Sequence, residues 1–189
     1  STSTFESNSA NYGGAVWSSN DDPEKPNGRI IIQSSEFKSN TANIQGGALC
    51  LNTPRSEVVD SEFRFNTAPI GGAIYWNGNE GKVQGSTFES NSGLNGSSIY
   101  WAYANGNLVS SDFKDTAPST GMVYWHGSNG AISQSTFEGT RAVHICSHAS
   151  DVALTSNTQV SNSYDGPSVY LEGTASFDSN DFMNAIYNY

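Results

Sequence analysis

The stretch GGAIYWNGNEGKVQGSTFESN, from Gly71 to Asn91, decides the fold because the chain repeats it. The fragments GGALCL, SSIYW and GMVYW are further copies of its first part, and each leads to a triplet of the form S-x-F. The last residue of that triplet forms a column at Phe5, Phe37, Phe63, Phe88, Phe113, Phe137, Val160 and Phe182. Successive members stand 22 to 32 residues apart, so the chain holds about eight copies of one unit.

Two more apolar columns accompany the phenylalanines. An aliphatic residue follows the glycines of each copy, at Val16, Leu49, Ile74, Ile99, Val123, Val143, Val169 and Ile186. A second apolar residue precedes the triplet, at Ile32, Val58, Val83, Leu108, Ile132, Leu154 and Phe177. The offset from Ile74 to Val83 is nine residues, and the offset from Val83 to Phe88 is five. Because side chains on one strand share a face only at even offsets, the chain must turn between these positions, where NGNEG and GS supply turn residues.

Three short strands and three corners in about 25 residues are typical of one coil of a parallel β-helix. No copy has the i, i+3, i+4, i+7 apolar spacing of an amphipathic helix, and propeller blades need about 40 residues. The sequence therefore predicts an all-β fold, a right-handed parallel β-helix of about eight coils, as a single domain over residues 1–189. The hand is the one that strand crossovers between parallel strands adopt.

The charge and composition of the chain exclude several classes of partner. The 189 residues include 18 Asp and Glu but only 8 Lys and Arg, for a net charge of −10. A nucleic-acid partner or an anionic membrane surface is therefore not expected, and no apolar run reaches the roughly 18 residues of a membrane span. The chain opens inside a repeat without a signal peptide, so we expect an excised segment of a longer surface protein with flanking domains. Low lysine with abundant serine and asparagine favours an extracellular location.

Two polar columns lie beside the phenylalanines. One stands two residues before them, at Ser3, Ser35, Ser61, Ser86, Ser111, Ser135, Thr158 and Asn180. The other stands three residues after them, at Asn8, Asn40, Asn66, Asn91, Thr116 and Thr140. Because stacked hydroxyls and amides can hydrogen-bond from coil to coil, we interpret both as structural ladders and not as metal ligands. Charges beside the phenylalanines should pair between coils, as Glu6 with Lys38, Arg64 with Glu89, and Lys114 with Glu138 or Glu89.

The order F-x-x-N followed by G-G-A and an aliphatic residue is seen in FESNSANYGGAV, FKSNTANIQGGAL and FRFNTAPIGGAI. It resembles the repeat of the chlamydial polymorphic outer-membrane proteins and, more closely, that of the adhesin-like surface proteins of methanogenic archaea. This resemblance implies a right-handed parallel β-helix that is secreted or displayed on a cell surface and acts in adhesion. It is strong from Ser1 to about Trp125. Later coils depart from it, because FEGTRAVHICSHAS lacks the Asn and Gly-Gly, and VSNSYDGPSVYL lacks the Phe.

An aromatic column is the candidate binding site. The residue after each aliphatic position is Trp17, Cys50, Tyr75, Tyr100, Tyr124, His144, Tyr170 or Tyr187. If Ile74 points inward, Tyr75 points outward, and Trp76 turns inward again or caps a corner. The candidate ligand-binding stripe is Trp17, Tyr75, Tyr100, Tyr124 and Tyr170. Exposed rings at one per coil suit stacking on sugars or burial under a partner, although rings can also stack only to cover the sheet.

Three other features are weaker candidates. The insertion SSNDDPEKPNGR in the first coil contains Asp21, Asp22 and Glu24, which suit Ca²⁺, although a solvated acidic loop is the favoured interpretation. The loop containing NTAPIGG varies in length between coils and is a place where binding differences accumulate. A further cluster consists of Arg141, His144, Cys146, His148 and Asp151. Its residue types suit zinc or a nucleophile, but no fourth ligand is evident and simple divergence of this coil is favoured.

The function expected from the sequence is that of an adhesin-like binding module on a cell surface, with a glycan or a partner cell surface as its target. The main alternative is a passive stalk that holds another domain outward. A polysaccharide lyase or glycosidase is the third possibility, because parallel β-helices include such enzymes, but the acidic residues are scattered along the sequence. We therefore expect no catalytic residue and no cofactor. Cys50 and Cys146 stand four coils apart, too far for a disulfide.

Overall fold

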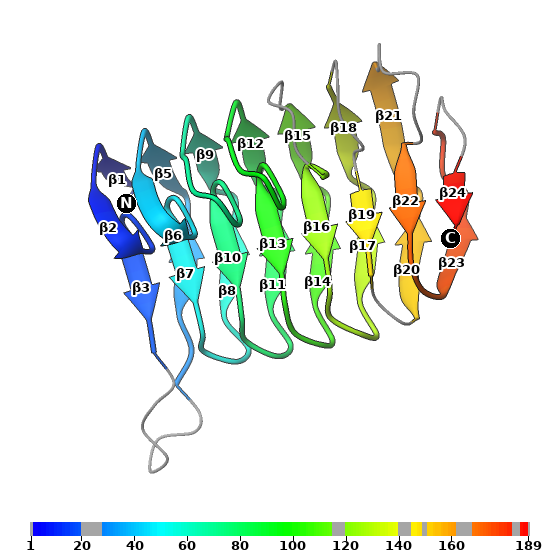
Figure 1. The fold of residues 1–189 in the computed structure, drawn as a ribbon, viewed down its shortest axis with the longest axis horizontal. Coiled ribbons are helices and arrows are strands. Elements are labelled where there is room, and N and C mark those ends of the chain that lie inside the picture. The colour runs from blue at the N-terminus through cyan, green and yellow to red at the C-terminus, as the bar shows by residue number, and fades with distance from the viewer. Residues whose placement is uncertain are drawn as a thin grey trace.

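The computed structural model describes residues 2–19, 28–114, 120–139, 145–148, 151–161, 168–182 and 186–188. Every regular element in these ranges is a β-strand, and every strand pairs in parallel with the equivalent strand of a neighbouring coil. Figure 1 shows the coils side by side along the long axis, with the N-terminus at one end and the C-terminus at the other. The predicted parallel β-helix is therefore confirmed.

Three long sheets form the walls of the β-helix. The phenylalanine sheet contains β1 (Ser3–Glu6), β5 (Ser35–Lys38), β9 (Glu62–Arg64), β12 (Thr87–Glu89), β15 (Asp112–Lys114), β18 (Thr136–Glu138) and β21 (Thr158–Ser161). The tryptophan sheet contains β3 (Val16–Ser18), β7 (Leu49–Leu51), β10 (Ile74–Trp76), β13 (Ile99–Trp101), β16 (Val123–Trp125), β19 (Ile145–Ser147), β22 (Val169–Leu171) and β24 (Ile186–Asn188). The valine sheet contains β4 (Ile31–Gln33), β8 (Glu57–Val59), β11 (Lys82–Gln84), β14 (Asn107–Val109), β17 (Ala131–Ser133), β20 (Val152–Thr155) and β23 (Ala175–Asp178).

A short fourth sheet and the strand counts complete the architecture. The strands β2 (Ser9–Tyr12) and β6 (Thr41–Gln45) pair beside the first two coils. Within the described residues, seven coils have all three walls, and the eighth is represented by β24. The sequence-based count of about eight is therefore slightly high for complete coils.

Equivalent residues pair directly across neighbouring strands. The phenylalanine column runs in register from Phe5 to Phe137, and the valine-sheet column runs in register from Ile32 to Phe177. Because parallel strands lie about 4.8 Å apart, this register stacks identical side chains one coil above the next. The stacked columns predicted from the repeat are thus present in the fold.

Three positions of the aliphatic, phenylalanine and serine columns were predicted wrongly in the last coils. The aliphatic column uses Ile145, not Val143, because Ile145 pairs with Val123. A register shift in the pairing of β18 with β21 sets Gln159, not Val160, opposite Phe137. Asn157, not Thr158, continues the serine column, since its Oδ1 accepts the N–H of Ser135 at 3.1 Å. These coils lack the Asn and Gly-Gly residues of the repeat, so the sequence does not show how they align with the earlier coils.

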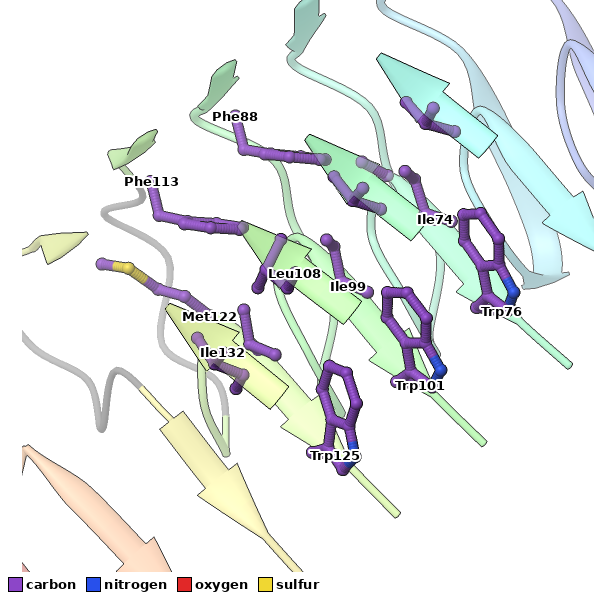
Figure 2. Close-up of a cluster of buried hydrophobic side chains, with 14 of the residues drawn as sticks. Ile74, Trp76, Phe88, Ile99, Trp101, Leu108, Phe113, Met122, Trp125 and Ile132 are labelled. Carbon is purple, nitrogen blue, oxygen red and sulfur yellow. The ribbon is translucent and has the colours of Figure 1, made fainter. Parts of the chain in front are cut away.

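The interior is filled by stacked apolar side chains, which Figure 2 shows for the central coils. Phenylalanine centroids lie 4.7 to 5.0 Å apart with planes within 7° of parallel. Trp76, Trp101 and Trp125 form a second buried stack, with centroids 4.7 and 4.5 Å apart. Since carbon atoms touch at about 3.5–4.0 Å, centroids at these distances require offset rings, which is the arrangement that aromatic pairs prefer.

Glycines permit two kinds of close approach in the central coils. Gly71 has a φ of +63°, and a Cβ there would lie 2.2 Å from the carbonyl oxygen of Ile74. A Cβ on Gly81 would lie 2.2 Å from the indole ring of Trp76, so the buried tryptophan packs directly on glycine. The GGA motifs therefore form a tight corner, and the last glycine of NGNEG leaves the space that the indole ring fills.

The asparagine ladder is saturated with hydrogen bonds. The Asn66 amide donates to Asn91 Oδ1 at 3.0 Å and to the carbonyl oxygen of Phe37 at 2.9 Å. Its own Oδ1 accepts the backbone N–H and the amide of Asn40, both at 3.0 Å. Asn8 donates to Asn40 in the same way, which confirms this ladder from the first to the fourth coil. Thr116 and Thr140 lie outside the described residues.

The serine ladder and the charge pairs are confirmed as well. Each serine N–H from Ser35 to Ser111 donates to the hydroxyl of the next serine at 3.2 Å, and that hydroxyl donates to a carbonyl two residues earlier. The pairs between coils are Lys38 with Glu6 at 2.9 Å, Arg64 with Glu89 at 3.2 Å, and Lys114 with Glu138 at 3.2 Å. All three are solvent-exposed, and pairs of this kind contribute about 0–1 kcal/mol.

Candidate functional site

The outer surface of the tryptophan sheet carries the aromatic column predicted from the sequence. Along β10, Ile74 and Trp76 are buried while Tyr75 between them is half-buried, as the alternation of a strand requires. The backbone register of this column is Trp17, Cys50, Tyr75, Tyr100, Tyr124, Cys146, Tyr170 and Tyr187. Cys146 takes the position expected for His144, because the sixth coil is displaced by two residues.

The rings of this surface form a continuous stack over four coils. Tyr75 and Tyr100 lie with centroids 5.3 Å apart, and Tyr100 and Tyr124 lie 4.9 Å apart at an interplanar angle of 9°. The next ring is His148, whose centroid lies 4.9 Å from that of Tyr124. We call Tyr75, Tyr100, Tyr124 and His148 the aromatic ladder. The sequence did not place His148 there, because it stands two residues beyond the residue whose backbone is in register.

Stacking determines which part of each ring a ligand can reach. Tyr100 has a neighbouring ring on both faces, so a sugar cannot lie flat against it without opening the stack. The ring edges remain available to a ligand, while the Tyr75 hydroxyl already shares a hydrogen bond with Gln45. The inner rungs are therefore poorly placed to stack on the flat faces of sugars. They are better placed to present a row of hydroxyls.

Burial governs the ionisation of the ladder. Burial raises the pKa of Tyr75, with smaller contributions from Tyr100 and Cys50, and a hydrogen bond with Gln45 opposes the rise. Burial also raises the pKa of Tyr100. Both hydroxyls therefore hold their protons well above neutral pH and can donate hydrogen bonds.

Trp17 differs from the tyrosines in the same column. Its side chain is 56% exposed, whereas Cys50, its neighbour in register, is only 2% exposed. Trp17 makes no ring contact with another described residue, because its neighbour in the next coil is the small side chain of Cys50 and the first tyrosine of the column, Tyr75, lies one coil further on. Tyr12, at the end of β2 in the same coil, is also exposed. Trp17 therefore offers the flat aromatic surface that the stacked rungs lack.

A charged group ends the aromatic ladder toward the C-terminus. His148 Nδ1 contacts Glu172, and the hydroxyl of Tyr170 donates to the other oxygen of Glu172 at 3.0 Å. The ring of His126 lies 6.4 Å from that of His148. Tyr170 is thus half-buried and tilted against His148, not stacked in line with the rungs. Sequence reasoning missed Glu172 because nothing in the repeat marks its position.

The face that carries the aromatic ladder is free of formal charge over its central coils. The segments 39–54, 65–79 and 90–111 contain no Asp, Glu, Lys or Arg. They build this face, and the last of them continues into β14 of the valine sheet. The exposed side chains of Trp17, Ile44, Leu94 and Tyr103 lie on these segments or on the equivalent part of the first coil, whereas those of Ile31 and Phe177 lie on the valine sheet. Over the central coils of a chain with a net charge of −10, this face is therefore without charge.

A shallow hollow of about 410 Å³ lies at the edge of this uncharged face. It is lined by Thr67, Ala68, Pro69, Ser92, Gly93 and Leu94. Leu94 is 71% exposed and is aligned with Pro69 of the preceding coil, whose carbonyl oxygen accepts its N–H at 2.9 Å. The hollow lies in the NTAPIGG loop region, which variable loop length marked as a candidate.

The remaining predicted sites are not assembled by the described residues. Asp21, Asp22, Glu24, Arg141 and His144 lie outside the described residues, as does the side chain of Cys146. Of the predicted cluster, His148 contacts Glu172 while Asp151 accepts a hydrogen bond from Thr174 at 2.8 Å, so the two have different partners. Within the described ranges, no three His, Cys, Asp or Glu side chains are placed to share a metal ion.

Comparison with known proteins gives one match. Residues 2–19, which span β1 to β3, match the model of the Chlamydia polymorphic membrane protein repeat. No curated protein and no solved structure matches the chain. The match supports the chlamydial resemblance within the first coil, and together with the β-helix it is compatible with an adhesin-like role at a surface. None of the described residues belongs to a helix long and apolar enough to cross a bilayer.

Proposed function

We propose that this β-helix is an adhesin-like binding module at the cell surface, exposed to the extracellular side. It binds an uncharged partner through the outer face of the tryptophan sheet. The observation that carries the proposal is the charge-free face, with its exposed rings, on a chain whose net charge is −10. Cores of binding interfaces are depleted of charge and enriched in tyrosine, tryptophan and phenylalanine, whereas a surface that only stays soluble is charged and mixed.

Carbohydrate is the partner class that this face fits best. Trp17 supplies an open ring for stacking on the apolar face of a sugar, and the tyrosine hydroxyls supply donors beside it. Neutral sugars need no counter-charge, and segments 65–79 and 90–111 provide none. A partner cell surface would be recognised through the same chemistry if it displays such sugars.

A passive stalk is the second candidate function. It is favoured by the uniform interior, where the asparagine and serine ladders stiffen every coil that they cross. An enzyme is less well supported. The carboxylates Glu6, Glu62, Glu89 and Glu138 beside the phenylalanine sheet are ion-paired with Lys or Arg, whereas hydrolysis of glycans needs two carboxyl groups facing one groove.

A glycan array, together with binding to whole cells, tests the proposal. We expect Trp17→Ala to lower the signal by about tenfold or more, as removal of a central aromatic anchor does. The matched control is Ile31→Ala, which removes a side chain of similar exposure, 52%, from the valine sheet. Binding to neutral glycans or cells that only Trp17→Ala weakens supports the adhesin role. If neither glycans nor cells are bound, or if both variants lose binding equally, the stalk is the better account.

A further inference from the structure

We propose that the aromatic ladder is a rail for one linear, neutral polysaccharide, which lies along the axis of the β-helix and places one sugar on each rung. This inference rests on the proposed function and names the shape, direction and register of its ligand. It starts from the row of phenol hydroxyls on Tyr75, Tyr100 and Tyr124, which are held at the spacing of the coils.

The rungs are held at nearly equal steps. Ring centroids are separated by 5.3 Å between the first two rungs, and by 4.9 Å in each of the next two steps. Their strands are locked in register by parallel pairing, so the rungs cannot slide independently. A ligand that repeats at the same distance makes the same contact again at each coil, and these contacts act together because they occur on one molecule.

The spacing selects the class of polymer. An extended peptide rises about 3.3 Å per residue and presents the same face only every second residue, about 6.6 Å apart, so it leaves register with the rungs after one or two steps. In an extended β-1,4-linked pyranose chain, each sugar advances the chain by its own length, which is close to one coil. Successive sugars alternate in orientation, but both edges of a neutral pyranose carry hydroxyls, so every rung meets a hydrogen-bonding group.

The chemistry of the rungs fits an edge-on contact. The inner ring faces are occupied by neighbouring rings, while the Tyr100 hydroxyl has no hydrogen-bond partner among the described residues. A sugar hydroxyl can accept from it or donate to it. Trp17 lies two coils before Tyr75, beyond the buried Cys50, and presents an exposed ring to a sugar that extends past the ladder.

The charge pattern selects a neutral polymer. Segments 65–79 and 90–111, which carry the first two rungs, contain no charged residue to pair with a uronate or sulfate. The net charge of −10 repels a polyanion at longer range. The first carboxylate to contact the ladder is that of Glu172, beside His148 at the last rung.

The test compares neutral oligosaccharide series of increasing length against tyrosine-to-phenylalanine variants. The probes are cello-, xylo-, manno- and chito-oligosaccharides of two to six sugars, with coiled α-1,4-linked malto-oligosaccharides as a control of shape. Tyr75→Phe, Tyr100→Phe and Tyr124→Phe remove one hydroxyl each and keep the stacked ring. Tyr103→Phe is the matched control, because Tyr103 is 49% exposed on the same face but outside the column.

We expect affinity for at least one β-1,4 series to rise with each sugar up to four, the number of rungs. Each variant in the column should weaken the longest ligand about threefold to tenfold, the effect of one net hydrogen bond, while Tyr103→Phe and the malto series show no effect. The proposal is overturned if no series shows length dependence, or if the column variants bind like wild type. In that case glycan or cell binding that is lost in Trp17→Ala still supports the adhesin role, so the two failures are distinguishable.

Discussion

Asn66 provides the sharpest test of how the coils are held together, because it lies in the middle of the asparagine ladder and is fully buried. The change Asn66→Ala removes four side-chain hydrogen bonds. Two are donated by its amide, to Phe37 and Asn91, and two are accepted by its Oδ1 from Asn40. The alanine leaves the N–H of Asn40 and the carbonyl of Phe37 without these partners in the interior of the fold.

The expected cost follows from that count. A net contribution of about 1 kcal/mol per bond gives a loss of about 4 kcal/mol in the free energy of unfolding, within a range of about 2–6 kcal/mol. Asn8→Ala is the matched control, because Asn8 is exposed and its side chain donates only one bond, to Asn40 at 2.9 Å. Its loss should cost less than about 1 kcal/mol.

Urea unfolding followed by far-ultraviolet circular dichroism measures both variants, and hydrogen exchange adds a local measure. The backbone N–H of Asn40, which donates to Oδ1 of Asn66 at 3.0 Å, should exchange faster in Asn66→Ala while amides of the last coils change little. Equal losses of stability in the two variants, or a loss below about 1 kcal/mol for Asn66→Ala, would refute the ladder as a source of stability.

Three further predictions concern single side chains. In the same urea titration, Trp125→Phe should lower the free energy of unfolding by about 1–2 kcal/mol more than Trp76→Phe. The Trp125 indole N–H donates to the carbonyl oxygen of Gly127 at 2.7 Å, whereas the buried indole N–H of Trp76 has no partner among the described residues. Burial raises the pKa of the Cys50 thiol from 9.0 to about 11, so the unfolded chain loses this proton first and stability should fall as the pH rises from 9 toward 11. Thermal scans of Cys50→Ala should show a shallower fall; an unchanged slope contradicts the assignment. Arg64→Ala should cost less than about 1 kcal/mol, and the difference from wild type should vanish in high salt, because its pair with Glu89 is exposed.

The aromatic ladder also changes what an aromatic surface on a β-helix implies for binding. Rings placed one per coil bring their faces against one another, because the strand spacing of about 4.8 Å is close to the centroid separation of two stacked rings, 4.9 Å between Tyr100 and Tyr124. An uninterrupted row is therefore poor at stacking on sugars and good at presenting edges and hydroxyls. An open face needs a gap, and the small Cys50 beside Trp17 provides one. Binding through such a surface should depend both on the tyrosine hydroxyls and on the open ring of Trp17. The tyrosine-to-phenylalanine variants test the first feature, and Trp17→Ala tests the second.

The class of fold, the phenylalanine column and the ion pairs of Glu6 with Lys38 and of Arg64 with Glu89 could all be predicted from the repeat. A parallel solenoid in register places equivalent residues of successive coils over one another. The spacing of similar residues in the sequence therefore predicts which residues are neighbours in the fold. The same reasoning located the aromatic column through Tyr75 and its equivalents, since alternation on a strand fixes which face a residue joins.

Features that depend on side-chain packing or on broken periodicity could be seen only in the folded chain. A bulge beside Phe137 and the displaced sixth coil changed which residues continue the columns, because without the Asn and Gly-Gly marks the register is set by backbone pairing alone. The way neighbouring side chains fill space also decides which ring faces are covered. It covers the faces of Tyr100, places His148 at the end of the stack and leaves the ring of Trp17 open. Spacing along a chain records which residues meet, but not which of their surfaces remain free.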